Sequence, residues 1–118
     1  MEAKVKYAPT MTEQTCERMI QRYTDKFNQL HAELLQDFTI LKWNMEAMIH
    51  SNEMIHLYKK LMSCGCDVDS VYEYEVGYVL KGYNVMQNST NEISNYEHRV
   101  RYKAKLDFLE EIKPYKTK

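Results

Sequence analysis

The segment with the strongest structural signal is residues 40–61, which reads ILKWNMEAMIHSNEMIHLYKKL. It contains no glycine and no proline, and neither residue occurs anywhere between Pro9 and Gly65. Because these two residues are the usual helix breakers, their absence favours helix across the interval. The segment is also apolar on two sides, and this property governs the predictions for both fold and function.

Two apolar stripes run along this part of the chain at helical spacing. The main stripe advances in steps of three and four. Its members are Cys16, Ile20, Tyr23, Phe27, Leu30, Leu34, Phe38, Leu41, Met45, Met48, Asn52, Ile55, Tyr58 and Met62. The second stripe has the heptad spacing of helices that pack against a partner. Its members are Ile40, Trp43, Ala47, His50, Met54, Leu57 and Leu61. At about 100° per residue the two stripes lie about 200° apart, so this helix has two faces to bury.

Start and stop signals divide the chain into helical regions at about 11–62, 71–86 and 90–112. Three pairs have capping-box spacing, in which each side chain satisfies the free amide of the other. These pairs are Thr10 with Glu13, Ser70 with Glu73, and Ser89 with Glu92. Gly65 and Pro114 follow lysines and mark helix ends.

The region 11–62 is either one helix or two. An unbroken helix would be about 78 Å long at a rise of 1.5 Å per residue. The step from Leu34 to Phe38 completes two successive steps of four, a stutter at which a helix can break, and Asp37 or Thr39 can then cap a new helix. A second possible break is at Ser51. We favour the long helix because no glycine or proline marks an end.

Residues 71–86 carry both helix and strand signals. Val71 to Tyr78 alternate and are rich in β-branched and aromatic residues, as in a strand. The steps of four and three from Tyr72 to Met86 favour a helix instead. We therefore predict an all-α fold, either an elongated helical hairpin or a three- or four-helix bundle with coiled-coil-like packing. The alternative is an α+β fold with a small hairpin at about 71–87.

The domain organisation follows from length and composition. We expect a flexible N-terminal arm at 1–9, a single helical domain at 10–113 and a tail at 114–118. The 16 basic and 17 acidic residues give a net charge of −1, which excludes a generally polybasic nucleic-acid binder. No apolar run approaches the ~20 residues that span a bilayer, so no membrane partner is expected. Three cysteines without a secretory signal favour a cytoplasmic location.

The second stripe predicts an interface. Helices covering 71–112 are too short to hide both faces of so long a helix. Each Trp, Met or Leu side chain that stays in water loses roughly 1.5–3 kcal/mol of the stabilisation that burial gives. We therefore expect the Ile40–Leu61 face to bind a second copy of the chain, and also another protein, with Trp43 as the anchor.

One segment suggests nucleic-acid binding as an alternative. Basic and aromatic side chains combine to bind single strands through phosphate contacts and base stacking. Here they are Tyr96, Arg99, Arg101, Tyr102, Lys103 and Lys105. On a helix these residues point in different directions, which favours an ordinary solvated surface.

Candidate metal ligands form a second alternative, and the pattern is weak. Glu53 and His56 have the Glu-x-x-His spacing of carboxylate-bridged metal bundles, but they point away from the main stripe and occur once. Cys64 and Cys66 form a lone C-x-C, where a structural zinc site needs four ligands. We therefore predict no metal and no cofactor.

No catalytic motif accompanies these features. The sequence contains no Gly-x-Ser-x-Gly, no P-loop and no dinucleotide fingerprint. The sequence therefore predicts a protein that is not an enzyme. We expect a non-enzymatic helical interaction module, a scaffold, adaptor or steric inhibitor, that acts as a homo-oligomer.

Overall fold

The computed structural model describes residues 9–87 and 92–117, and this part of the chain is helical almost throughout. Its elements are α1 (Glu13–Gln36), the 3-10 helix η1 (Phe38–Ile40), α2 (Leu41–Ser63), α3 (Val68–Gln87), α4 (Glu92–Ile112) and the 3-10 helix η2 (Lys113–Tyr115). The all-α prediction is confirmed, with four packed α-helices. The alternative β-hairpin at 71–87 is wrong, because α3 occupies that segment as one helix.

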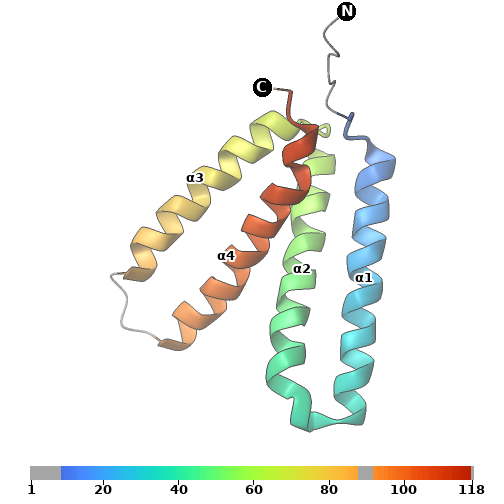
Figure 1. The fold of residues 1–118 in the computed structure, drawn as a ribbon, viewed down its shortest axis with the longest axis vertical. Coiled ribbons are helices and arrows are strands. Elements are labelled where there is room, and N and C mark those ends of the chain that lie inside the picture. Colours follow the sequence, from blue (N-terminus) through green and yellow to red (C-terminus); the bar gives the residue numbers. More distant parts are fainter. Residues whose placement is uncertain (1–8, 88–91, 118) are drawn as a thin grey trace, which may run out of the picture.

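The helices form two hairpins that share one end (Figure 1). Helices α1 and α2 run antiparallel along the long axis of a molecule that measures 59 × 37 × 30 Å. Helix α4 packs against α2 near the α2–α3 turn and diverges from it toward the α1–α2 turn, while α3 packs on α4. We call residues 13–23 with 54–63 the hairpin base, and residues 35–45 the hairpin tip. The tip extends beyond α3 and α4.

The long helix predicted for 11–62 breaks at Asp37. This residue is extended, with φ −147° and ψ 99°, and its carboxylate accepts hydrogen bonds from the amide of Thr39 at 2.9 Å and its hydroxyl at 2.6 Å. These bonds lower the pKa of Asp37 below its ordinary value. The continuous helix is therefore wrong, and the stutter at Leu34 to Phe38 marks the real break. A local side-chain cap competes with the helix here without any glycine or proline.

The helix starts lie near the predicted capping boxes but use different residues. Helix α1 is capped by Thr12 rather than Thr10, and the Thr12 hydroxyl accepts the amide three residues on at 3.1 Å. Helix α3 is capped by Asp67 rather than Ser70, whose amide donates to the Asp67 carboxylate at 3.2 Å. The box at Ser89 lies outside the described residues. In both cases the side-chain oxygen of the actual cap accepts the amide of the residue three positions further on.

The predicted helix ends agree with the structure. Gly65 adopts a φ of +68° directly after α2, as a left-handed helix end requires. Helix α4 ends at Ile112, and Pro114 lies in η2. Of the predicted terminal segments, residues 1–8 of the arm lie outside the described part. The tail contacts the fold, since the amide of Thr117 donates to Asp69 at 3.0 Å.

The core lies at the hairpin base. The ring of Phe108 from α4 meets the ring of Tyr58 edge-on at 4.9 Å, and both side chains are almost fully buried. The hydroxyls of Tyr23 and Tyr58 both donate to the carboxylate of Glu111, the latter at 2.7 Å. Burial and these bonds raise the pKa of both tyrosines. The main stripe therefore meets α4 at this end. Within the described residues, no helix has a run long and apolar enough to cross a membrane.

Candidate interaction surface

The second apolar stripe is divided between the core and the surface. Met54, Leu57 and Leu61 are 0%, 3% and 0% exposed and belong to the core cluster together with Phe108. These three residues are not available to a partner, which corrects the prediction that the whole Ile40–Leu61 face is intermolecular. The reason is geometric, because α4 packs against α2 at the base and diverges from it toward the tip (Figure 1).

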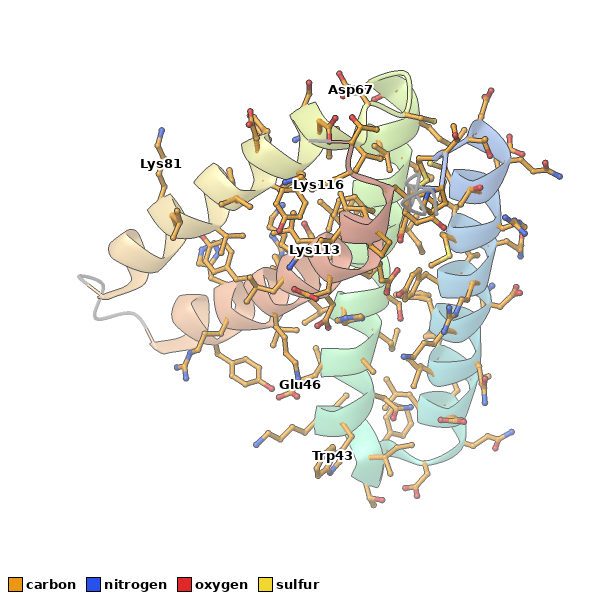
Figure 2. The ribbon with its side chains drawn as sticks, turned by 45° about the horizontal axis from the view of Figure 1, so that its top comes forward. Trp43, Glu46, Asp67, Lys81, Lys113 and Lys116 are labelled. Carbon is orange, nitrogen blue, oxygen red and sulfur yellow. The ribbon has the colours of Figure 1, made fainter. Side chains whose placement is uncertain are left out.

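The other half of the stripe stays accessible around Trp43. The indole is 77% exposed, whereas Ile40 and Ala47 are half-buried. Figure 2 shows Trp43 at the start of α2, far from the α2–α3 turn. His50 marks the boundary, since its Nε2 lies 2.8 Å from a carboxylate oxygen of Asp107 on α4. Toward the tip from this contact, α2 and α4 separate.

Trp43 belongs to a group of exposed apolar side chains at the hairpin tip. All are 45% exposed or more. We call them the hairpin-tip patch, which consists of Leu35, Phe38, Leu41, Trp43 and Met45. Large apolar side chains clustered on the surface mark binding sites more often than scattered ones do.

The tip is held in place by a buried polar contact. Asn44 is 6% exposed, and its side-chain amide donates to the backbone carbonyl of Leu30 on α1 at 2.8 Å. Because this buried side-chain amide donates to the backbone of the neighbouring helix, it fixes the start of α2 against the last turns of α1. The patch is therefore presented on a fixed hairpin end, which limits the entropy that binding would cost.

A groove beside Trp43 is lined by residues of α1, α2 and α4. Its volume is about 420 Å³. It is lined by Lys26, Trp43, Glu46, Ala47, His50, Val100, Lys103 and Asp107. The lining carries two lysines and two carboxylates around an apolar floor. At its edge the Tyr96 hydroxyl donates to Glu46, and this bond raises the pKa of the tyrosine.

The predicted nucleic-acid segment does not form one surface. Tyr102 is buried, and a Cβ added at Gly82 would lie 2.0 Å from its ring, so α3 packs directly on the aromatic face. Lys105 is mostly buried in ion pairs, and Tyr96 is bonded to Glu46. Arg99, Arg101 and Lys103 are exposed. Tyr102 and Lys105 therefore serve the packing of the bundle, and of the two tyrosines only Tyr96 remains exposed.

The candidate metal ligands are also dispersed. Glu53 lies 3.5 Å from the ammonium of Lys105, and His56 is exposed. Cys64 is exposed, while Cys66 lies near a different thiol, that of Cys16. In the part of the chain that the structure describes, no three His, Cys, Asp or Glu side chains come together as a metal site would require.

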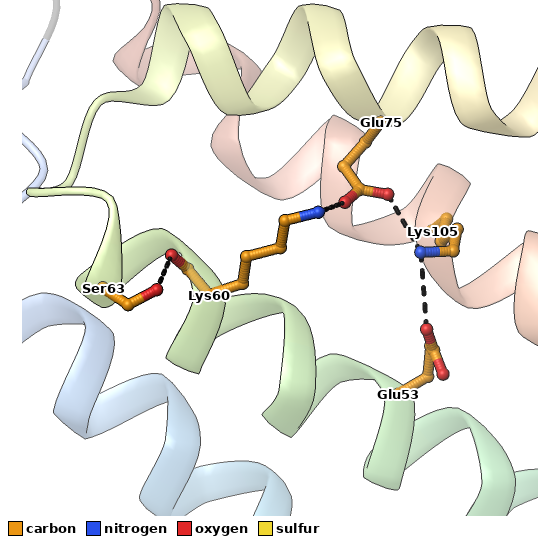
Figure 3. A network of polar contacts seen from close by, with 5 residues as sticks. All are labelled: Glu53, Lys60, Ser63, Glu75 and Lys105. Carbon is orange, nitrogen blue, oxygen red and sulfur yellow. Dashed lines mark hydrogen bonds and ion pairs between the residues drawn. The ribbon is translucent and has the colours of Figure 1, made fainter.

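A buried charged cluster was missed by sequence reasoning. The carboxylate of Glu75 on α3 is 1% exposed and lies 2.9 Å from both Lys60 of α2 and Lys105 of α4 (Figure 3). Glu75 stands on a stripe with Val71 and Val79 at steps of four, and this position on the buried face of α3 was the available signal. The steps of four and three from Tyr72 to Met86, which predicted this helix, do not include Glu75.

The cluster joins three helices by charge. Burial lowers the pKa of Lys105, but the hydrogen bond and ion pair with Glu75, together with Glu53, outweigh it and leave that pKa raised. The lysine therefore remains charged, and the carboxylate has two donors. Because each of these charges has a partner, the cluster ties α2, α3 and α4 together.

The fold and this surface define an all-α bundle with an exposed apolar hairpin end. Comparisons of the chain with protein-family models, with curated proteins and with solved structures found no match.

Proposed function

We propose that the protein is a non-enzymatic helical interaction module that associates with a second copy of itself through the hairpin-tip patch. The single observation that carries the proposal is the 77% exposure of Trp43, the most exposed residue of that patch. Trp is the residue most enriched among the anchors of protein interfaces. Burying a large apolar side chain against a partner contributes roughly 1.5–3 kcal/mol to the free energy of association.

The charge pattern of the neighbouring groove favours a second copy as the partner. In a two-fold interface the same surface patch of each copy is in contact, so a patch with charges of only one sign repels its counterpart. This groove carries Lys26 and Lys103 together with Glu46 and Asp107. Such a mixed lining allows each basic group to face an acidic group of the other copy. The resulting dimer is proposed to act as a scaffold, adaptor or steric inhibitor toward another protein, in the cytoplasm, where thiols stay reduced.

The test measures self-association in matched variants. Leu35 at the tip and Leu80 on α3 are both 61% exposed, so aspartate at either position has a similar effect on the monomer. We expect the wild-type chain to have twice the monomer mass of 14.2 kDa by light scattering. Trp43→Asp and Leu35→Asp are expected to give monomers, and Leu80→Asp to remain dimeric, all with the helical circular dichroism of the wild type.

A monomeric wild type across accessible concentrations contradicts the proposal. So does a dimer that Trp43→Asp leaves intact. Retention of the chain on single-stranded nucleic acid at low salt, lost as salt rises, would instead favour Arg99, Arg101 and Lys103 as the functional surface.

A further inference from the structure

Two thiols far apart in sequence lie close together at the hairpin base. The Sγ atom of Cys16, in the first turn of α1, is 4.0 Å from that of Cys66, in the turn between α2 and α3. All three cysteines are free. A disulfide has its sulfurs about 2.05 Å apart, so this pair needs a relative movement of about 2 Å to form one.

The backbone conformation of Cys66 holds its side chain in this place. Cys66 has a φ of +60°, in the left-handed region, and it follows Gly65 at +68°. Its amide donates to the carbonyl of Leu61 at 2.9 Å, which closes the end of α2. Residues other than glycine seldom adopt this conformation, and such positions concentrate at functional sites. The first turn of α1 is fixed in turn by the bond from the Cys16 amide to the Thr12 carbonyl at 3.0 Å.

The two thiols differ in access to solvent. Cys16 is 0% exposed, and burial, reinforced by the adjacent Cys66, raises its pKa to about 12. Cys66 is half-buried and borders a cleft of about 200 Å³ between Pro9, Val68 and Tyr115. A small oxidant therefore reaches Cys66 before Cys16. The buried Cys16 keeps its proton because its pKa is raised.

We propose that Cys16 and Cys66 form a redox modification site that a peroxide converts into an intramolecular disulfide. The Cys66 thiolate attacks one peroxide oxygen, the O–O bond breaks, hydroxide leaves, and Cys66 becomes a sulfenic acid. The sulfur of Cys16 then attacks Cys66, and its proton leaves with the sulfenic hydroxyl as water. In total, two thiols and one hydrogen peroxide give one disulfide and two waters.

The disulfide would link the start of α1 to the α2–α3 turn. It would close a loop across a sequence separation of 50 residues, which restricts the unfolded chain. For a loop of this size we expect the melting temperature to rise by about 10 °C. The linkage lies at the opposite end of the hairpin from Trp43 (Figures 1 and 2), so it is independent of the proposed self-association.

Peptide mapping of the full-length protein tests the site. The reduced protein is treated with hydrogen peroxide, alkylated and cleaved with trypsin. Cys16 falls in peptide 7–18, and Cys66 falls with Cys64 in peptide 61–81. We expect the two peptides to appear as one linked species in which the Cys16–Cys66 bond replaces two S–H bonds, whatever oxygen the methionines take up. Cys64→Ser is the matched control, because it removes the ambiguity within 61–81 and should form the same linkage.

Melting curves provide the second measurement. The wild type and Cys64→Ser should gain about 10 °C after oxidation and lose it with reductant. Cys16→Ser should gain nothing, and if it does not fold, the peptide maps of the wild type and Cys64→Ser decide alone. The proposal is overturned if no linked peptide forms in Cys64→Ser, or if Cys66 proceeds to sulfinic acid while Cys16 remains open to alkylation.

Discussion

The two ends of the α1–α2 hairpin share their helices but differ in what covers them. At the base, Tyr58 and Leu61 are 1% and 0% exposed beneath α4. At the tip, Phe38 and Trp43 are 68% and 77% exposed, although they continue the same two stripes. The stripes alone therefore do not decide burial. The path of α4 does, because it meets α2 at one end and diverges toward the other (Figure 1).

The base is also the end where polar contacts converge. Glu111 of α4 accepts from Tyr23 and Tyr58, and Glu75 of α3 pairs with lysines of α2 and α4. These contacts fix the crossing of α4 over α2, because each links different helices through a carboxylate, that of Glu75 buried and that of Glu111 half-buried. At the tip, Asn44 supplies the one comparable buried side-chain contact among the described residues of 35–45. Stability is therefore concentrated at the base.

The largest expected difference between the two ends is in the loss of unfolding free energy when a phenylalanine at each end is replaced by alanine. Phe108→Ala removes a fully buried ring from the base and should cost about 3–5 kcal/mol of unfolding free energy. Phe38→Ala at the tip removes an exposed ring and should change the free energy of unfolding by about 0.5 kcal/mol or less. Urea denaturation followed by circular dichroism measures both. Equal losses would show that the tip contributes to the core and would contradict the division between the two ends.

A smaller difference is expected within α3, between its buried and exposed carboxylates. Glu75→Gln leaves Lys60 and Lys105 without their shared charge and should cost about 2 kcal/mol, which is less than the roughly 3–5 kcal/mol typical of fully buried pairs because Lys60 is partly exposed. Glu73→Gln, on the exposed side of the same helix, should cost about 0.5 kcal/mol or less. Urea midpoints at neutral pH compare the two variants. If Glu75→Gln is as stable as the wild type, the cluster does not hold the three helices together.

Much of the fold could be predicted from sequence because its signals are local. The absence of breakers, the helical steps and the Gly65 stop depend on neighbouring residues, and they gave the helices to within a few positions. The break at Asp37 was harder, because its carboxylate competes with the helix through Thr39 rather than through a change of composition. The stutter marked the position, but only packing of the two halves decides that the chain folds back.

The candidate surface was predictable in part, because it depends on how distant helices meet. Trp43 is 77% exposed, so the bundle does not bury it, and the role of its face as an interface stays a prediction. The placing of Leu57 and Leu61 on the same free face failed, since both belong to a core cluster that includes residues of α1, α3 and α4, far away in the chain. Glu75 and the Cys16–Cys66 pair are contacts between separate elements, and no spacing rule in one sequence reports such contacts.

The smallest expected effect is at the tip, where Asp37 caps the break between α1 and α2. Asp37 has a lowered pKa through its bonds from Thr39, so its contribution to stability is present above the ordinary Asp pKa of about 4 and is lost as pH falls through the lower folded value. Asp37→Ala should therefore be less stable than the wild type at pH 6, with the two converging near pH 2. Asp37→Asn keeps an acceptor oxygen without the titrating charge, so its stability relative to Asp37→Ala should not change over that range. Urea midpoints at several pH values give the comparison, and a gap between wild type and Asp37→Ala that persists unchanged at pH 2 would mean that the carboxylate does not act through its charged form.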